Sequence, residues 1–129
     1  MIVVDSSVWI SYLRGNFGPQ TAKLERAGRE RRIIVGDLVL LEILRGARDE
    51  DHASSLARWM SAFRQEAMLG PDLAREAAAR YRDLRGLGIT VRKTADLVIA
   101  NFCVSRGYAL LHQNRDFDLM AGPLGLTIV

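Results

Sequence analysis

The sequence contains little cysteine, proline, histidine or lysine, and it has no long apolar run. Its one cysteine, Cys103, has no partner for an internal disulfide, and it lies in an apolar helical stretch where we expect it to fill the core. No apolar run reaches the roughly 18 residues that a membrane-spanning helix needs, and no secretion signal opens the chain. These absences exclude a disulfide-stapled scaffold and a membrane-embedded protein, and they predict a soluble cytoplasmic protein.

Lysine is scarce because all but two of the 18 basic residues are arginine, the exceptions being Lys23 and Lys93. With 15 acidic residues the formal net charge is +3. The planar guanidinium group of arginine suits phosphate, so this excess favours a nucleic-acid partner. A GC-rich coding sequence that replaces lysine by arginine explains it equally well, and the charge alone does not decide between the two.

Several motifs that would indicate a particular chemistry are missing. No cysteine or histidine pair has the spacing of a zinc site, and the only histidines are His52 and His112. Neither of the common glycine-rich phosphate loops occurs. Zinc enzymes and nucleotide-binding proteins of those kinds are therefore excluded.

Short apolar strands alternate with helical segments along the whole chain, and 129 residues suffice for one domain, residues 1–129. Such alternation predicts an α/β fold with a parallel sheet and helices on both of its faces. The expected strands are Met1–Asp5, Arg32–Gly36, Glu66–Leu69, Tyr108–Leu111 and Leu126–Val129. The expected helices begin at Ser6–Ser7 and at Pro19, Leu38, Asp51, Pro71, Thr94 and Asp116, and they end near Leu13, Ala27, Arg45, Arg64, Leu84, Ser105 and Met120.

Two carboxylates follow strands and two lie on apolar helices. Asp5 ends the first strand, and Asp116 comes shortly after the Tyr108–Leu111 strand. Asp96 lies in the first turn of a helix, and Glu42 is embedded in one that is apolar almost all round. Asp5, Asp96 and Asp116 could each simply cap a helix, which stabilises it by about 0.5 to 2 kcal/mol. Capping does not explain why apolar strands bring Asp5 and Asp116 to one sheet edge, where the sites of such folds lie.

Carboxylates that converge at one edge need a partner, because like charges at close range raise each other's pKa. Mg²⁺ or Mn²⁺ would supply it, since these hard cations prefer oxygen ligands and take further ligands from phosphates. The residue types therefore favour a divalent metal site acting on a phosphate compound.

At these positions the sequence resembles the PIN-domain ribonucleases, and in particular the VapC-type toxins of bacterial toxin–antitoxin pairs. Four segments carry the resemblance in family order: IVVDSSVWI at 2–10, LLEILRG at 40–46, TADLVIA at 94–100 and LLHQNRDFD at 110–118. Each segment alone is a weak signal, but together they span nearly the whole chain.

The resemblance implies a sheet of order 3-2-1-4-5 and a Mg²⁺ or Mn²⁺ ion held by an acidic quartet, which maps onto Asp5, Glu42, Asp96 and Asp116. Ser7 would support the first acid. Asn114 occupies a place where relatives often carry another aspartate, which leaves open whether one or two ions bind. The implied reaction is hydrolysis of RNA phosphodiester bonds without a covalent intermediate, with Asp96 or Asp116 accepting the proton of the attacking water.

RNA that approaches an acidic site needs cations around it. The candidates for phosphate contacts are Arg14, Arg45, Arg92, Lys93 and Arg115, although any one of them could merely solvate the surface. The resemblance further implies a cognate VapB-type antitoxin, a homodimer, and an RNA substrate such as a tRNA or rRNA loop. Trp9, Tyr12 and Leu13 share a helical face that suits either the core or, together with the helix of Leu40, an antitoxin groove. The helix with Trp59 and Phe63 is a candidate for the dimer contact.

Alternatives from other classes fit less well. A phosphoacceptor receiver domain has an acidic pair after its first strand and a lysine after its fifth, whereas here Asp5 is followed by Ser6 and neither lysine is so placed. A phosphatase of the haloacid-dehalogenase type requires a second aspartate where Ser7 stands. A non-catalytic binding domain with the same fold would be expected to have lost some of the four acids.

Overall fold

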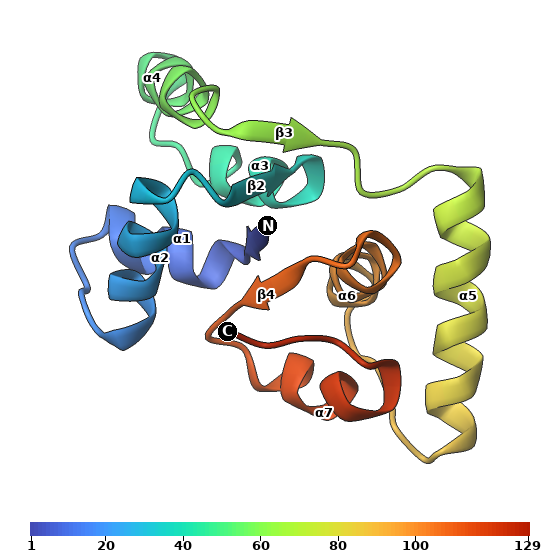
Figure 1. The fold of residues 1–129 in the computed structure, drawn as a ribbon. Helices are drawn as coiled ribbons and strands as arrows, with labels where there is room; N and C mark the ends of the chain where they lie inside the picture. Colours follow the sequence, from blue (N-terminus) through green and yellow to red (C-terminus); the bar gives the residue numbers. More distant parts are fainter.

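Four short parallel strands form the centre of the computed structural model, which describes residues 1–129 (Figure 1). They are β1 (Ile2–Val4), β2 (Ile33–Gly36), β3 (Arg64–Glu66) and β4 (Ala109–Leu111), in the order β3-β2-β1-β4. Every pairing is parallel, with Ile2 opposite Ile33 on one side and Ala109 on the other. The predicted α/β class and the order 3-2-1-4 are therefore confirmed.

The prediction of a fifth strand at Leu126–Val129 is wrong, because this segment does not form a strand. This segment runs beside β4 but forms only one isolated bridge, between Leu110 and Ile128. Two hydrogen bonds hold it: Leu110 N–H donates to Thr127 O at 2.8 Å, and Val129 N–H donates to Leu110 O at 2.9 Å. The segment is half solvent-facing, and it follows directly after the left-handed turn at Gly125, so too few residues remain for a continuous ladder.

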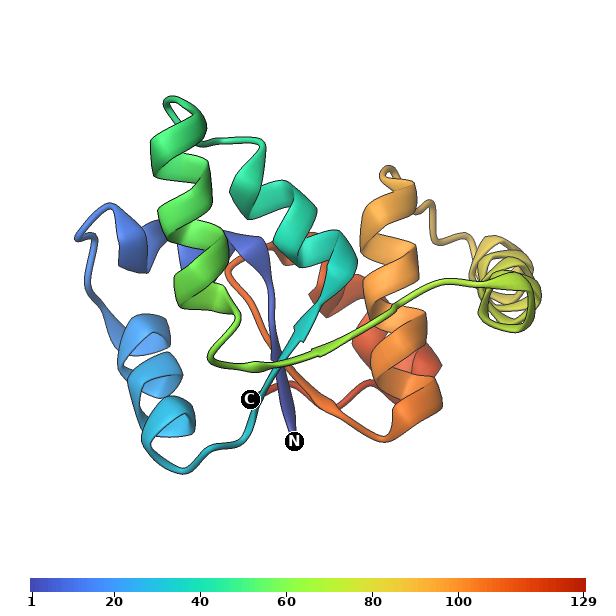
Figure 2. The same cartoon turned by 90° about the horizontal axis from the view of Figure 1, so that it is seen from above.

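Seven helices flank the strands. They are α1 (Ser6–Leu13), α2 (Pro19–Arg29), α3 (Asp37–Leu44), α4 (Glu50–Met60), α5 (Pro71–Gly86), α6 (Thr94–Arg106) and α7 (Arg115–Leu124). Figure 2 shows α1, α2 and α4 on one side of the strands and α5, α6 and α7 on the other. None of these helices is long and apolar enough to span a membrane.

The core lies between the strands and the helices next to them. β1 and β2 are buried along their whole length, as expected for apolar strands covered on both faces, and Trp9, Phe102 and Phe117 are the largest fully buried side chains. Cys103 is fully buried, and burial raises the pKa of its thiol to about 12. It is therefore the neutral core residue that the sequence predicted.

The largest errors of the sequence prediction lie between α3 and α5. The helix predicted over Asp51–Arg64 already ends at Met60, and the strand predicted at Glu66–Leu69 is β3, which ends at Glu66. β3 is an edge strand whose side chains are mostly exposed, so it lacks an apolar pattern. Met68, which lies within the predicted strand, instead follows β3, and its fully buried side chain packs against Gly36.

Candidate active site

Asp5 follows β1 and begins α1, and it is almost fully buried. Its Oδ2 accepts hydrogen bonds from Ser7 N–H at 3.1 Å and from the Ser7 hydroxyl at 2.5 Å. The N-cap of α1 is thus Asp5 and not Ser6 or Ser7, because its carboxylate accepts the N–H of the second helical residue. Ser7 holds the Asp5 carboxylate in one orientation.

The loop after β4 connects the other acids to Asp5. Gln113 N–H donates to Ser7 Oγ at 3.1 Å, and the Gln113 side chain accepts from Ser11 Oγ at 2.9 Å. The next residue, Asn114, donates through Nδ2 to Asp96 Oδ2 at 3.1 Å and accepts the Asp116 N–H at 3.0 Å. One loop therefore links β1, the start of α6 and the start of α7.

Glu42 enters from α3, which begins directly after β2. Its side chain is half-buried, and Ser6 Oγ donates to its Oε1 at 3.3 Å. The two serines in the first turn of α1 therefore donate to different acids, Ser6 to Glu42 and Ser7 to Asp5. Gly36 precedes α3 and has no room for a side chain, since a Cβ atom there would clash with the side chain of Met68.

The four acids act on one another electrostatically. Burial raises the pKa of Glu42, and the negative charges of Asp5 and Asp96 raise it further, against the hydrogen bond from Ser6 and the charge of Arg45. Burial also raises the pKa of Asp96, as do Asp5 and Asp116, although Asn114 and Lys93 oppose the shift. Both carboxylates therefore resist ionisation unless a cation joins them.

The carboxylates do not form a closed ligand set in this structure. No three histidine, cysteine, aspartate or glutamate side chains lie close enough together to bind one metal ion. The chemistry of the donors nevertheless fits a hard divalent cation, because all four are carboxylates and two of them have raised pKa values from burial and mutual repulsion.

The predicted cationic residues are all exposed, and they differ in how close they come to the acids. Arg92 Nη2 lies 3.8 Å from Asp116 Oδ1. Arg45 and Lys93 lower the pKa of Glu42 and Asp96 respectively, so they lie near those groups. Arg14 lines a cavity together with Glu42, whereas Arg115 makes no ion pair.

The sequence alone does not indicate four of the supporting residues. Ser6 is expected only at the start of a helix, and no pattern marks Gln113 and Ser11, which connect the loop to α1. His112 accepts the Asn114 N–H through Nδ1 at 3.0 Å and is buried. Its Nε2 lies 3.2 Å from Asp118 Oδ1 without hydrogen-bond geometry. Only the position of His112 and Gln113 beside Asn114 could have suggested these roles.

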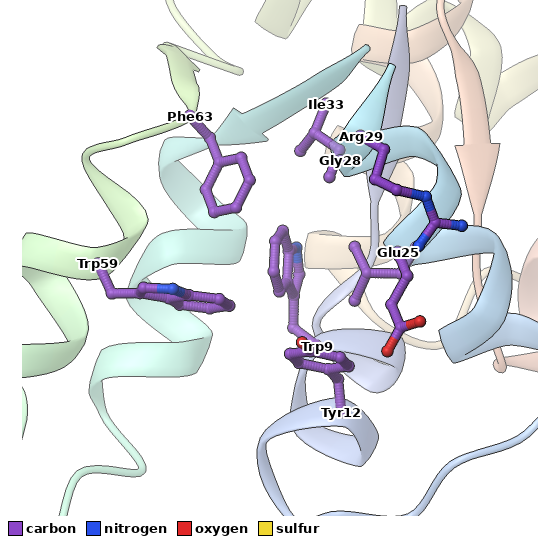
Figure 3. Close-up of a pocket in the computed structure, with 9 residues that line it drawn as sticks. Trp9, Tyr12, Glu25, Gly28, Arg29, Ile33, Trp59 and Phe63 are labelled. Atoms are coloured by element: carbon purple, nitrogen blue, oxygen red, sulfur yellow. The ribbon is translucent and has the colours of Figure 1, made fainter. Parts of the chain in front are cut away.

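A separate groove lies between α1, α2 and α4, and Figure 3 shows the ring of Trp9 between those of Trp59, Phe63 and Tyr12. The Trp9 ring centre is 5.6 Å from that of Trp59 and 5.2 Å from that of Phe63. The groove has a volume of about 460 Å³. Trp9 itself is buried, as the core interpretation predicted, whereas Leu13 is exposed.

Comparison with known proteins yields close sequence relatives. Residues 2–123 match the sequence model of the PIN domain. A VapC ribonuclease of Mycobacterium bovis is 32% identical over 126 residues, which cover 94% of this chain and 92% of the relative. Ribonuclease VapC11 of Mycobacterium tuberculosis matches to the same extent.

Solved structures share the fold at lower sequence identity. The VapBC2 complex of Rickettsia felis bound to a promoter DNA fragment contains a chain with a TM-score of 0.79 and 16% identity, over 100% of this chain and 98% of that one. FitAcB of Neisseria gonorrhoeae has a TM-score of 0.76 and 16% identity, over 99% of this chain and 96% of that one. VapBC-5 of M. tuberculosis has a TM-score of 0.68 and 23% identity, over 98% of this chain and 95% of that one.

Proposed function

This chain belongs to the PIN-domain family as a VapC-type ribonuclease, and from that premise we propose that four of its carboxylates bind the divalent ion with which it cleaves RNA. These are Asp5, Glu42, Asp96 and Asp116. The observation that carries the proposal is that the loop after β4 connects Ser7, which holds Asp5, with Asp96 and with the backbone of Asp116. Burial and the neighbouring acids also raise the pKa of Glu42 and of Asp96, and a shared cation would stabilise these carboxylates. The ion is Mg²⁺ or Mn²⁺, since every donor is a carboxylate oxygen.

Such an ion, when bound, polarises the phosphoryl oxygens and makes a coordinated water more acidic. The chain's own residues supply the remaining functions. Asp96 or Asp116 accepts the proton of the attacking water, and Asn114 contacts both of these residues. Arg92 lies beside Asp116 and is exposed, so it contacts a neighbouring phosphate of the RNA. Arg14, Arg45, Lys93 and Arg115 are the further phosphate contacts.

Ser7 and Asn114 orient the acids and do not react. Ser7 fixes Asp5 by two hydrogen bonds and accepts a third from the loop after β4. Asn114 keeps Asp96 and the start of α7 at a fixed separation. Its amide adds no charge to the site, which favours one metal ion over two.

We further propose that the protein is the toxin of a toxin–antitoxin pair and that a VapB-type antitoxin occupies the aromatic groove of Figure 3. The solved relatives in this fold include VapBC and FitAB complexes, which supports such a partner. The groove is lined by Trp9, Tyr12, Trp59 and Phe63, a surface suited to the apolar face of a helix. A homodimer stays a prediction, and Trp59 and Phe63, its first candidates, form a wall of this groove.

The test of the active centre compares Asp5→Asn and Asp96→Asn with the exposed control Asp83→Asn, using single-stranded RNA with Mg²⁺ or Mn²⁺. The first two should cut at least about 100-fold more slowly than wild type, and the control should cut normally. Circular dichroism verifies that all three are folded. Wild-type rates in folded Asp5→Asn and Asp96→Asn proteins would disprove the proposed centre.

The toxin role is tested in cells. RNA ends are sequenced after induced expression, with and without the neighbouring gene. New RNA ends and a growth defect that the neighbour relieves are expected, and their position would identify the target, for which a tRNA or rRNA loop is the candidate. Neither new ends nor a growth effect would mean that the protein is not a toxin of this kind.

A further inference from the structure

A second cavity adjoins the acidic centre on the side of α3 and α4. Its volume is about 300 Å³, and Glu42 forms part of its wall, so it opens directly beside the proposed metal site. It differs from the aromatic groove, which contains none of the four acids. A group held in this cavity would therefore lie next to the reacting phosphate.

The wall of the cavity on the α4 side is held by local hydrogen bonds. His52 Nδ1 accepts the Arg48 N–H at 3.0 Å, and the Asp49 carboxylate accepts the His52 N–H at 2.7 Å as the N-cap of α4. In the neutral imidazole this leaves the proton on Nε2, which is a donor without a partner in the chain. The imidazole of His52 is thus fixed before any ligand arrives.

The other lining groups are of two kinds. Leu13 at the end of α1 and Leu56 on α4 supply apolar surface. Arg14 and Arg48 are exposed and have no carboxylate partner within ion-pair distance. An apolar hollow with a fixed imidazole and two free guanidinium groups matches a nucleotide, whose base is flat and whose phosphate is anionic.

We propose that this cavity binds one unpaired nucleotide of the RNA substrate, adjacent to the phosphodiester that is cut. The base packs between Leu13 and Leu56, and His52 stacks on it or donates to its edge, while Arg14 and Arg48 bind the flanking phosphates. A base that is paired and stacked in a helix cannot enter such a recess, so the site selects single-stranded loops. The inference rests on the proposed ribonuclease function and adds a subsite to it.

The experiment measures binding of a fluorescein-labelled, ten-nucleotide single-stranded RNA by anisotropy, in the cleavage-deficient Asp96→Asn background with Mg²⁺ present. Leu56→Trp fills the cavity and Arg48→Glu reverses its charge. The matched controls are Leu87→Trp and Arg82→Glu, which make the same changes at exposed residues outside the cavity. Loss of one stacked base and its phosphate contacts should weaken binding about ten-fold or more in the first two proteins and leave the controls unchanged.

A second arm uses RNAs in which one base at a time is replaced by an abasic ribose. One abasic position should weaken binding to the protein with an intact cavity, and the same position should have no effect with Leu56→Trp. This coupling would not arise if Leu56→Trp merely loosened the fold, and thermal melting of each variant checks the fold directly.

Equal RNA affinity of the cavity variants and their controls would overturn the nucleotide subsite, and so would cavity variants that lose only antitoxin binding. Failure of the proposed function looks different, because wild-type protein would then cut no RNA with either ion. If wild-type protein cleaves RNA and the cavity variants bind and cleave it equally well, the nucleotide subsite is refuted while the proposed ribonuclease function stands.

Discussion

The side-chain amide of Asn114, in the loop after β4, donates a hydrogen bond to the carboxylate of the buried Asp96 at 3.1 Å. The same side chain accepts the Asp116 N–H at 3.0 Å. Asn114 therefore offsets part of the burial and repulsion that raise the pKa of Asp96.

Asn114→Asp should bind Mn²⁺ more tightly and be less stable without it. The substitution removes a hydrogen-bond donor to Asp96 and adds a fifth negative charge. A bound cation would neutralise this added charge, whereas the metal-free protein would retain the repulsion. We expect a melting temperature several degrees lower in chelator and a larger rise on adding Mn²⁺ than in wild type. Asn114→Ala, which only removes the hydrogen bonds, is the control. Equal metal affinity in all three proteins would contradict this account.

The stability of the metal-free protein should decrease as the pH rises. Glu42 and Asp96 have folded-state pKa values above their ordinary ones, so the folded state binds more protons than the unfolded state. Their destabilising effect is absent below the ordinary carboxyl range, about pH 4, and grows as the pH rises through the raised values toward neutrality. Asp96→Asn removes one of these charges, so it should melt higher than wild type at pH 7.5 in chelator and change less with pH. Urea unfolding at several pH values measures this, and a wild-type slope in the Asp96→Asn protein would rule it out.

Gly36→Ala should destabilise the protein by about 1 to 3 kcal/mol. A Cβ atom at this position would clash with the side chain of Met68, which is fully buried and therefore has little freedom to move away. Because Gly36 leads into α3, the shift should also displace Glu42 and lower activity. Gly122→Ala, in the exposed part of α7 with nothing within 4 Å, should instead be neutral or stabilising. Adding Met68→Ala should recover part of the loss, and additive effects of the two substitutions would mean that they do not clash.

His112 should act through Asn114. Its Nδ1 accepts the Asn114 N–H at 3.0 Å, and its ring centre lies 5.2 Å from that of Phe117. His112→Phe keeps the packing but leaves that amide without its acceptor, whereas His112→Asn supplies an oxygen near the position of Nδ1. We expect Mn²⁺ affinity to fall about ten-fold in the Phe variant and to recover in the Asn variant. Calorimetric titration measures the affinity, and a loss of the same size in both variants would show that only the ring matters.

The sequence predicted most of what depends on periodicity and on neighbouring residues. Buried strands such as β1 and β2 are apolar throughout, and the alternation of strands with helices correctly predicts that they are parallel. Their order is implied by the family resemblance and not by periodicity. β3 was misplaced because an exposed edge strand has no apolar pattern to reveal it. The segment at Leu126–Val129 has the composition of a strand, but only one bridge forms.

The candidate site shows the same division. The resemblance identifies the four acids, and the expectation that Asp5 and Asp116 meet at one edge follows from parallel strands that end there. The contacts that orient them join residues far apart in the chain, such as Ser6 with Glu42 and Gln113 with Ser7. No local pattern encodes such pairs, because they depend on how α1, α3 and the loop after β4 pack in space.

The pairing of Ile2 with Ala109 across the centre of the sheet also sets a time order during synthesis. β1 is made before the other strands, yet one of its two neighbours, β4, is separated from it by more than 100 residues. Asp5 and Asp116 can therefore meet only after β4 has been translated. A nascent chain that does not yet include β4 has no assembled acidic centre. Such a chain would not cleave RNA while it is still being translated.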